Sequence, residues 1–180
     1  MSASLMRMLV LGGARSGKSR YAQQLATRRW KRPLYLATAE VKDEEMAQRV
    51  QAHRQARGAR WWCVEEPLDI ANVITNSTAD TDGILVDCLT LWLSNVLLQE
   101  GEDTYKKRRQ ALLDAVRNIR HNLILVGNEV GMGIVPEHEL GRKFRDLAGW
   151  LHQDLAVAMD TVVLVVAGLP LALKGTLPKC

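Results

Sequence analysis

Aromatic residues are scarce in this chain of 180 residues, where they make up 5% of the sequence and include a single phenylalanine. Proteins that bind single-stranded nucleic acid commonly stack the bases on aromatic side chains, so we do not expect a site of that kind. Cysteine is also scarce. Cys63, Cys88 and Cys180 have no CxxC spacing, which argues against a disulfide framework and against a zinc site.

Long apolar segments are missing as well. No segment approaches the roughly 20 apolar residues of a membrane-spanning helix. The apolar run near the N-terminus ends after a few residues in a glycine-rich segment, which is not the pattern of a signal peptide. We therefore expect a cytoplasmic protein without a membrane span. The length suits one domain with a hydrophobic core and is too short for two ordinary domains.

Acidic residues are absent from one basic stretch. Between Glu45 and Glu65 there is no carboxylate, and the stretch contains a single histidine, His53. Its arginines are Arg49, Arg54, Arg57 and Arg60. A positive segment without a local counter-charge predicts an anionic ligand. The mild net charge of +4 fits that prediction, although nucleic-acid binding or simple solubility would explain it equally well.

Short apolar runs alternate with longer stretches of helical periodicity. The apolar runs cover 8–11, 33–37, 83–87, 122–127 and 161–168, with a possible further strand at 61–64 and a short closing strand at 169–174. Helices are expected at about 18–29, 43–57, 68–76, 89–99, 104–120 and 138–159. Runs that are apolar throughout suit strands buried on both faces of a parallel sheet. The alternation predicts an α/β fold, with a doubly wound, mostly parallel sheet and a single domain over 1–180.

The segment GGARSGKS contains the P-loop pattern GxxxxGK[ST] between a predicted strand and a predicted helix. It comprises Gly12, Gly13, Ala14, Arg15, Ser16, Gly17, Lys18 and Ser19. Its glycines allow backbone N–H groups to turn inward around phosphate oxygens, and the helix N-terminus adds partial positive charge. We expect Lys18 to act catalytically by reaching the β- and γ-phosphates, and the Ser19 hydroxyl to ligate Mg²⁺. The motif therefore predicts nucleotide binding.

An acid at the end of a neighbouring strand is the second requirement of a P-loop site, because it holds Mg²⁺ directly or through water. The apolar run 83–87 ends in Asp87, so Ser19 and Asp87 are the candidate magnesium ligands. The alternative is that Asp87 caps the helix predicted at 89–99. Neither interpretation indicates which molecule accepts the phosphoryl group.

His53 lies on the apolar face of the helix predicted at 43–57. At 100° per residue it shares this face with Met46 and Val50, and Arg49 and Arg57 lie one turn away on either side. Two guanidinium groups beside an imidazole favour its neutral form, which is a nucleophile. The same position also suits an ordinary core histidine with a satisfied hydrogen bond, and the spacing leaves both interpretations open.

Several segments together resemble one family. They are, in chain order, GGARSGKS, YLATAE, DEEMAQRVQAHRQAR, WWCVEEP, VDCLTLWLSN, NEVGMGIVPEHELGRKFRDLAGWLHQDLA and VVLVVAGLPLALK. Over nearly the whole chain, in order and spacing, they are similar to the bifunctional adenosylcobinamide kinase / adenosylcobinamide-phosphate guanylyltransferase family. The block NEVGMGIVPE…FRDLAG is specific, because a generic P-loop kinase does not carry it.

The resemblance implies a RecA-like P-loop NTPase and a two-step enzyme of cobalamin biosynthesis. The first step would phosphorylate adenosylcobinamide with ATP or GTP. The second would transfer GMP from GTP to that phosphate, giving adenosylcobinamide-GDP and pyrophosphate. The implied cofactor is Mg²⁺, and the implied partners are the corrinoid substrates, GTP and ATP, without nucleic acid. Relatives assemble as trimers, so we expect a homo-oligomer.

The resemblance also assigns residues. The second step in the family passes through GMP bound covalently to a histidine, and His53 followed by Arg54 matches that position. Thr38 is expected to contact the nucleotide, and its alternative role is that of a hydroxyl that stabilises a turn. Glu65 is expected to be the family's acidic contact, and Glu66 is the alternative. The nucleotide contacts implied outside the P-loop and Asp87 are Ala37, Thr38, Ala39, Arg54, Gln55, Ala56, Arg57 and Glu65.

The second half of the chain contains weaker candidates. Asn128 and Glu129 follow the strand predicted at 122–127, where strand ends meet the ligand crevice of an open sheet, and Glu129 is kept as a candidate. One departure from the family is His152, which stands in the helix predicted at 138–159 where many relatives have an asparagine. We expect this change to affect packing or subunit contacts more than chemistry.

Arg142, Arg145 and Asp146 lie within three to four residues of one another in the helix predicted at 138–159. We interpret them as an intrahelical charge pair and not as a site.

Two other functions stay open on the motifs alone. A monofunctional P-loop kinase of another small molecule would keep the P-loop and Asp87 and make His53 incidental. A P-loop ATPase of the recombinase type would bind DNA with a steep salt dependence. The scarcity of aromatic residues and the lack of a concentrated basic stripe argue against the second.

Overall fold

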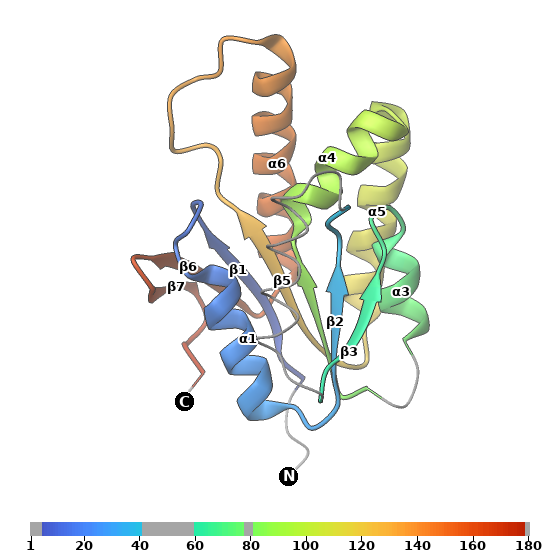
Figure 1. The fold of residues 1–180 in the computed structure, drawn as a ribbon, viewed down its shortest axis with the longest axis vertical. Coiled ribbons are helices and arrows are strands. Elements are labelled where there is room, and N and C mark those ends of the chain that lie inside the picture. Colours follow the sequence, from blue (N-terminus) through green and yellow to red (C-terminus); the bar gives the residue numbers. More distant parts are fainter. Residues whose placement is uncertain (1–4, 41–59, 78–80, 179–180) are drawn as a thin grey trace.

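The computed structural model describes residues 5–40, 60–77 and 81–178. One sheet of seven strands runs through this described part of the chain, and helices lie on both of its faces (Figure 1). The strands are β1 (Arg7–Gly12), β2 (Pro33–Ala37), β3 (Trp62–Glu65), β4 (Gly83–Asp87), β5 (Asn122–Asn128), β6 (Thr161–Val166) and β7 (Leu169–Lys174). Their order in the sheet is β3-β2-β4-β5-β1-β6-β7, and every pair is parallel except β6–β7.

The helices divide unequally between the two faces. α1 (Lys18–Arg29) packs on one face, and four helices pack on the other: α3 (Ile70–Asn76), α4 (Leu89–Gln99), α5 (Glu102–Asn118) and α6 (Glu139–Ala158). The doubly wound architecture is therefore confirmed for the described residues. Within that same part of the chain, the helices are too short or too polar to cross a bilayer.

The central strands are buried on both sides, because alternate residues of each strand face opposite layers. Leu9 and Leu11 of β1 belong to the core beneath α3–α6, whereas Met8 and Val10 belong to the core beneath α1. This arrangement explains why the strands are apolar throughout and do not alternate with polar residues. Burying each such side chain contributes roughly 1.5–3 kcal/mol.

Most predicted elements are confirmed, with shifts of one or two residues at their ends. The helix predicted at 43–57 lies outside the described residues. The strand predicted at 161–168 is wrong at its end, because β6 stops at Val166. Ala167 and Gly168 have positive φ angles of 51° and 80°, which turn the chain back into β7. As a result β7 runs antiparallel to β6, an orientation that the sequence pattern did not indicate.

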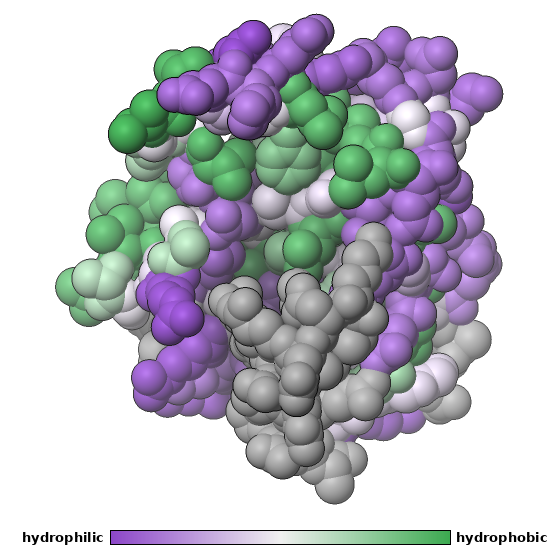
Figure 2. Space-filling model, turned by 45° about the horizontal axis from the view of Figure 1, so that its top comes forward, coloured by the Kyte–Doolittle hydropathy of each residue, from purple (hydrophilic) through white to green (hydrophobic). Residues whose placement is uncertain are grey.

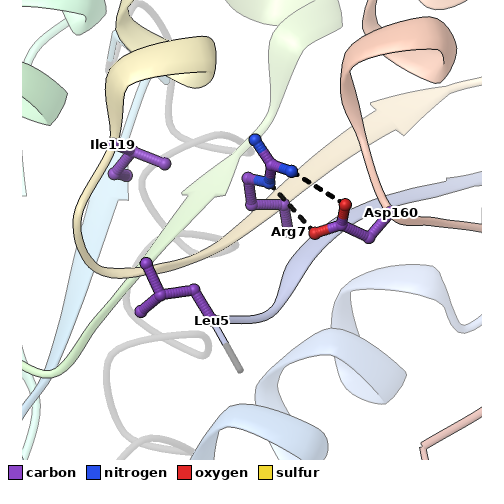
Figure 3. A pocket seen from close by; sticks show the side chains of 4 residues that line it. All are labelled: Leu5, Arg7, Ile119 and Asp160. Atoms are coloured by element: carbon purple, nitrogen blue, oxygen red, sulfur yellow. Dashed lines mark hydrogen bonds and ion pairs between the residues drawn. The ribbon is translucent and has the colours of Figure 1, made fainter. Parts of the chain in front are cut away.

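A small pocket lies at the amino ends of the strands, at the edge opposite the P-loop (Figure 3). Leu5, Arg7, Ile119 and Asp160 line it. Arg7 donates to both Asp160 oxygens, through Nε at 3.0 Å and through a terminal nitrogen at 2.8 Å. This bidentate pair raises the pKa of Arg7 and lowers that of Asp160. The two charges balance each other, and the ion pair links β1 to Asp160, the residue before β6.

Candidate nucleotide-binding site

The carboxyl ends of the parallel strands meet at one edge of the sheet. Gly12 of β1 lies opposite Asn128 of β5 in the strand register. Ala37 of β2 lies between Asp87 of β4 and Glu65 of β3. Predicted site residues from separate segments therefore lie along the edge where open α/β sheets bind ligands. Figure 2 is turned toward this edge and shows a recessed centre bordered by hydrophilic and hydrophobic surface.

The P-loop bends sharply between β1 and α1. Arg15 and Gly17 have positive φ angles of 57° and 93°, the left-handed conformation that turns neighbouring backbone N–H groups toward one side. Gly12 has no room for a side chain, because a Cβ there would lie 2.5 Å from Ser16 Oγ and 2.6 Å from a carbonyl oxygen of β6. The β6–β7 turn supports the loop from outside, where the Gly168 N–H donates to the Ser16 carbonyl at 2.8 Å.

The first turn of α1 is open to an anion. Gly17 is its N-cap, no side chain caps the helix, and the first turn contains no acidic residue. The first N–H groups of a helix have no partner within the helix, and the helix dipole places partial positive charge there. Gly13, Ala14 and Arg15 are exposed, so the loop is accessible to solvent. These features together suit a phosphate group.

Lys18 is held between two neutral acceptors. Its Nζ donates to the Gly13 carbonyl at 3.1 Å and to Asn128 Oδ1 at 2.9 Å. Burial lowers the pKa of Lys18, while the charges of Cys88 and Asp87 act in the opposite direction. Among residues 5–40, 60–77 and 81–178, no carboxylate forms an ion pair with this partly desolvated ammonium group, which suits a phosphate ligand.

The Asp87 carboxylate is oriented by β2, where the Tyr35 hydroxyl donates to its Oδ2 at 3.1 Å. Its alternative role as a helix cap is wrong, because Cys88 is the N-cap of α4 and no side chain caps that helix. Ser19 lies half-buried in the first turn of α1. No cluster of three or more potential metal-ligating side chains is present among the described residues.

Thr38 is fully buried and connects β2 to β4. Its hydroxyl donates to the Cys88 carbonyl at 2.7 Å and accepts from the Cys88 N–H at 2.9 Å. The Thr38 N–H donates to the Asp87 carbonyl at 3.3 Å, and the Thr38 carbonyl accepts from Asn95 Nδ2 at 2.8 Å. These bonds match the alternative role, a turn hydroxyl. Contact between Thr38 and a nucleotide stays a prediction.

Cys88, the hydrogen-bond partner of Thr38, is half-buried. Burial raises the pKa of the Cys88 thiol to about 11, and the charge of Asp87 acts in the same direction. Ala37 and Ala39, on either side of Thr38, are both half-buried. Their predicted nucleotide contacts are untested.

Glu65 and Glu66 have different surroundings. The Glu66 carboxylate accepts from the N–H groups of Leu68 and Asp69, both at 2.9 Å, just before α3. Glu66 therefore has a local structural role. Glu65 is exposed at the end of β3, on the same edge of the sheet as Asp87. The position of Glu65 supports its choice as the acidic contact.

Thr90 contacts the candidate site through Asn128, and the sequence analysis did not select it. It lies in the first turn of α4, and its Oγ1 accepts from the Asn128 N–H at 2.7 Å. The same hydroxyl donates to the Asn128 carbonyl at 3.4 Å. The only available signal was a hydroxyl three residues after Asp87, and a threonine in a helix is too common to indicate a site.

The weaker candidates of the second half are placed as follows. The Glu129 N–H donates to the Gly12 carbonyl at 2.9 Å, and the Glu129 carboxylate accepts from the Gly131 N–H. His152 is buried against Gly127, where a Cβ would lie 2.8 Å from its Nε2. Burial lowers the pKa of His152, and the charge of Glu129 opposes this effect. His152 therefore has a packing role beneath the end of β5.

The charged residues of α6 form local contacts. Arg145 pairs with Asp146, as expected for a charge pair within the helix. Arg142 donates to the carbonyl groups of Pro136 and Glu137 in the preceding loop. The expected charge pair is thus confirmed for two of the three residues.

The predicted nucleophile and its neighbours lie outside the described residues. They are His53, Arg54, Gln55, Ala56 and Arg57. Their roles stay predictions.

Comparison with known proteins matches residues 8–173 to the family described as cobinamide kinase / cobinamide phosphate guanyltransferase. The bifunctional adenosylcobalamin biosynthesis protein CobP of Pseudomonas aeruginosa is 46% identical over 170 residues, covering 94% of this chain and 98% of the relative. The corresponding protein CobU of Salmonella typhimurium is 41% identical over 182 residues, covering 94% of this chain and all of the relative.

Two solved structures share the fold at low sequence identity. An ATPase from a type III secretion system of pathogenic bacteria has a TM-score of 0.54 and 10% identity, over 93% of this chain and 56% of its own. A Pyrococcus horikoshii protein has a TM-score of 0.51 and 11% identity, over 94% of this chain and 86% of its own. These likenesses show a RecA-like P-loop NTPase fold and nothing about activity. By its sequence match over residues 8–173, the chain belongs to the cobinamide kinase / cobinamide phosphate guanyltransferase family.

Proposed function

We propose that this protein phosphorylates adenosylcobinamide with ATP or GTP and then transfers GMP from GTP to the resulting phosphate. The observation that carries the proposal is Lys18, held by Gly13 and Asn128 at an uncapped helix start, in a chain of this family. The geometry supports nucleotide binding, and the family supplies the acceptor.

The kinase step requires positioning more than covalent chemistry. The acceptor hydroxyl attacks the γ-phosphorus, the bond from that phosphorus to the β–γ bridging oxygen breaks, and the hydroxyl proton passes to solvent. The products are adenosylcobinamide phosphate and a nucleoside diphosphate. Lys18 and the N–H groups at the start of α1 would stabilise the negative charge that develops on the phosphate oxygens.

Ser19 and Asp87 would hold Mg²⁺, directly or through water. Both offer oxygen ligands, and Asp87 has one oxygen oriented by Tyr35. When bound, the ion would neutralise negative charge on the β- and γ-phosphate groups.

The transferase step divides one displacement into two. A neutral nitrogen of His53 attacks the α-phosphorus of GTP, and the bond to the α–β bridging oxygen breaks, which releases pyrophosphate. A phosphate oxygen of adenosylcobinamide phosphate then attacks the same phosphorus. The phosphorus–nitrogen bond breaks, and the free imidazole returns. Arg54 and Arg57 would balance the charge of the triphosphate, and Glu65 would contact the guanine N–H edge.

Two labels test the proposal. Incubation with adenosylcobinamide, Mg²⁺ and γ-labelled GTP is expected to label the corrinoid. Incubation with α-labelled GTP is expected to label the protein first and the corrinoid second. Transfer of the γ label alone would leave a monofunctional kinase, and transfer of neither label would contradict the proposal.

Two further expectations accompany this function. We expect it to operate in the cytoplasm, without nucleic acid as a partner. We also expect a homo-oligomer, a trimer by resemblance. The exposed apolar residues Val166, Leu169, Leu171 and Leu173 of the β6–β7 hairpin support self-association.

A further inference from the structure

The tip of β5 lies between the two strands that carry the phosphate and metal residues. β5 pairs with β1 on one side and with β4 on the other. Asn128 is the last residue of β5 and lies opposite Gly12, the first residue of the P-loop. A side chain at this position therefore lies beside the start of the P-loop.

The contact with Lys18 fixes the orientation of the Asn128 amide. A lysine ammonium is a donor only, so the amide oxygen must face it, as the 2.9 Å contact from Lys18 Nζ to Asn128 Oδ1 shows. The amide nitrogen, which carries two N–H donors, therefore points away from Lys18. Within the described part of the chain, no acceptor for that nitrogen is found.

Thr90 holds the Asn128 backbone in place. Its Oγ1 accepts from the Asn128 N–H at 2.7 Å and donates to the Asn128 carbonyl at 3.4 Å. Thr90 follows Asp87 by three residues at the start of α4. The hydroxyl therefore joins the end of the metal-ligand strand β4 to the tip of β5.

We propose that Asn128 is a catalytic residue that donates a hydrogen bond from Nδ2 to the γ-phosphoryl group of the bound nucleotide, and that Thr90 is the residue that positions it. This inference rests on the proposed function and assigns the group that recognises the phosphoryl group to be transferred. Lys18 and Asn128 act as a pair, because the lysine orients the amide and both donate to the same phosphate. The bond strengthens as negative charge develops on the γ-phosphate oxygens.

The two half-reactions differ in what they require of this contact. The kinase step breaks the bond between the γ-phosphorus and the β–γ bridging oxygen. The transferase step breaks the bond at the α-phosphorus, and the γ-phosphate leaves as part of pyrophosphate. Loss of the Asn128 donor is therefore expected to slow the kinase step by about 100-fold. It should slow formation of the GMP adduct by less than about tenfold, because this step loses only one hydrogen bond to the bound triphosphate.

The test compares affinities for GDP and for the β,γ-imido analogue of GTP by calorimetry in the presence of Mg²⁺. The reference protein and all variants carry His53→Ala, because the β,γ-imido group blocks transfer of the γ-phosphoryl group and does not block attack of His53 on the α-phosphorus. Asn128→Ala removes the donor. Asn128→Asp keeps an oxygen for Lys18, removes the donor and adds a charge that repels phosphate. Both variants are expected to lower the preference for the triphosphate by about tenfold or more. The neutral variant Asn128→Ala decides the outcome, because the added charge of Asn128→Asp lowers affinity for the triphosphate by itself.

Thr90→Val and Thr90→Ser test the positioning role. Thr90→Val is expected to reduce the triphosphate preference by a smaller factor, and Thr90→Ser is expected to restore it. A preference within twofold of the reference protein in Asn128→Ala would overturn the role of Asn128. An unchanged preference in Thr90→Val would overturn the role of Thr90.

The affinity ratio separates this inference from the proposed function. A wild type that binds both nucleotides but transfers no phosphoryl group to adenosylcobinamide would contradict the proposed function. The ratio would still decide whether Asn128 contacts the γ-phosphate. Equal losses of affinity for both nucleotides in Asn128→Ala would count against the contact.

Discussion

Lys18 and Thr38 both lie at the carboxyl edge of the sheet, and they use their hydrogen-bonding groups in different ways. Lys18 is half-buried, and two neutral acceptors hold its ammonium group. Thr38 is fully buried, and its hydroxyl both donates to and accepts from Cys88. The first residue belongs to the cradle, by which we mean the P-loop with Asn128. The second belongs to the junction, by which we mean Thr38 with Cys88 and Asn95.

Two polar residues at the same edge of the sheet therefore differ in whether neighbouring protein groups already satisfy their hydrogen-bonding capacity. In the cradle, positive charge and helix N–H groups have no matching anion within the described part of the chain. In the junction, the donors and acceptors satisfy one another, which is the requirement for burying them at low cost. The cradle is therefore expected to determine activity, and the junction to determine stability.

Lys18→Ala is expected to have the largest effect on activity of the substitutions considered. Removing the ammonium group is expected to slow phosphoryl transfer by about 100-fold or more, because it stabilises charge on the transferring phosphate. Stability should change little, because burial already lowers the pKa of Lys18 and its ammonium group has no carboxylate partner among the residues that the structure describes.

Steady-state transfer from γ-labelled GTP measures this rate. Arg20→Ala is the matched control, because Arg20 is an exposed cation two residues further along α1. The control is expected to stay within about twofold of wild type. A Lys18→Ala rate within fivefold of wild type would contradict the assignment of the cradle.

Thr38→Val is expected to show the opposite pattern. It keeps the shape of the side chain and removes the hydroxyl, which leaves the Cys88 N–H and carbonyl without their partner. The free energy of unfolding is expected to fall by about 1–3 kcal/mol, and the KM for nucleotide to change less than twofold. Urea unfolding and nucleotide titration measure the two quantities, with Thr38→Ser as the variant that keeps the hydroxyl. A raised KM at unchanged stability would contradict this expectation, because it would show that Thr38 contributes to nucleotide binding.

Glu66→Ala and Glu65→Ala are expected to separate stability from nucleotide binding in the same way, with smaller effects. Loss of the Glu66 carboxylate leaves the N–H groups of Leu68 and Asp69 without their acceptor, and is expected to cost about 0.5–2 kcal/mol of stability. Glu65→Ala is expected to reduce the preference for GTP over ATP instead. Thermal unfolding and competition between the two nucleotides distinguish these outcomes. An exchange of the two effects would assign the guanine contact to Glu66.

The local patterns of the sequence were sufficient for much of the fold. The apolar runs predict the strands because every strand from β1 to β6 is short and lacks a competing helical period. The strand order could not be predicted, because the insertion of β5 between β1 and β4 depends on pairing between distant segments. The end of β6 was missed because Ala167 adopts a positive φ angle that glycine or asparagine usually provides.

The site could be predicted where its residues are adjacent in one sequence motif. It could be predicted less well where residues far apart in the sequence contact each other. GGARSGKS predicts the cradle because its residues are adjacent in sequence. The Thr90–Asn128 contact spans 38 residues and leaves no local pattern. The role of Thr38 could not be settled from the sequence, because whether a hydroxyl has a partner depends on the neighbouring strand.

The covalent GMP–histidine intermediate is tested directly by intact-mass analysis after incubation with GTP and Mg²⁺ and denaturation without acid. The wild type is expected to carry one added GMP, which is lost in acid and survives base. His53→Ala is expected to carry none, and His152→Ala, a control at a buried histidine, is expected to keep it. A wild type that transfers the γ-phosphoryl group but never carries GMP would contradict the two-step account, and an adduct that persists in His53→Ala would contradict the assigned nucleophile.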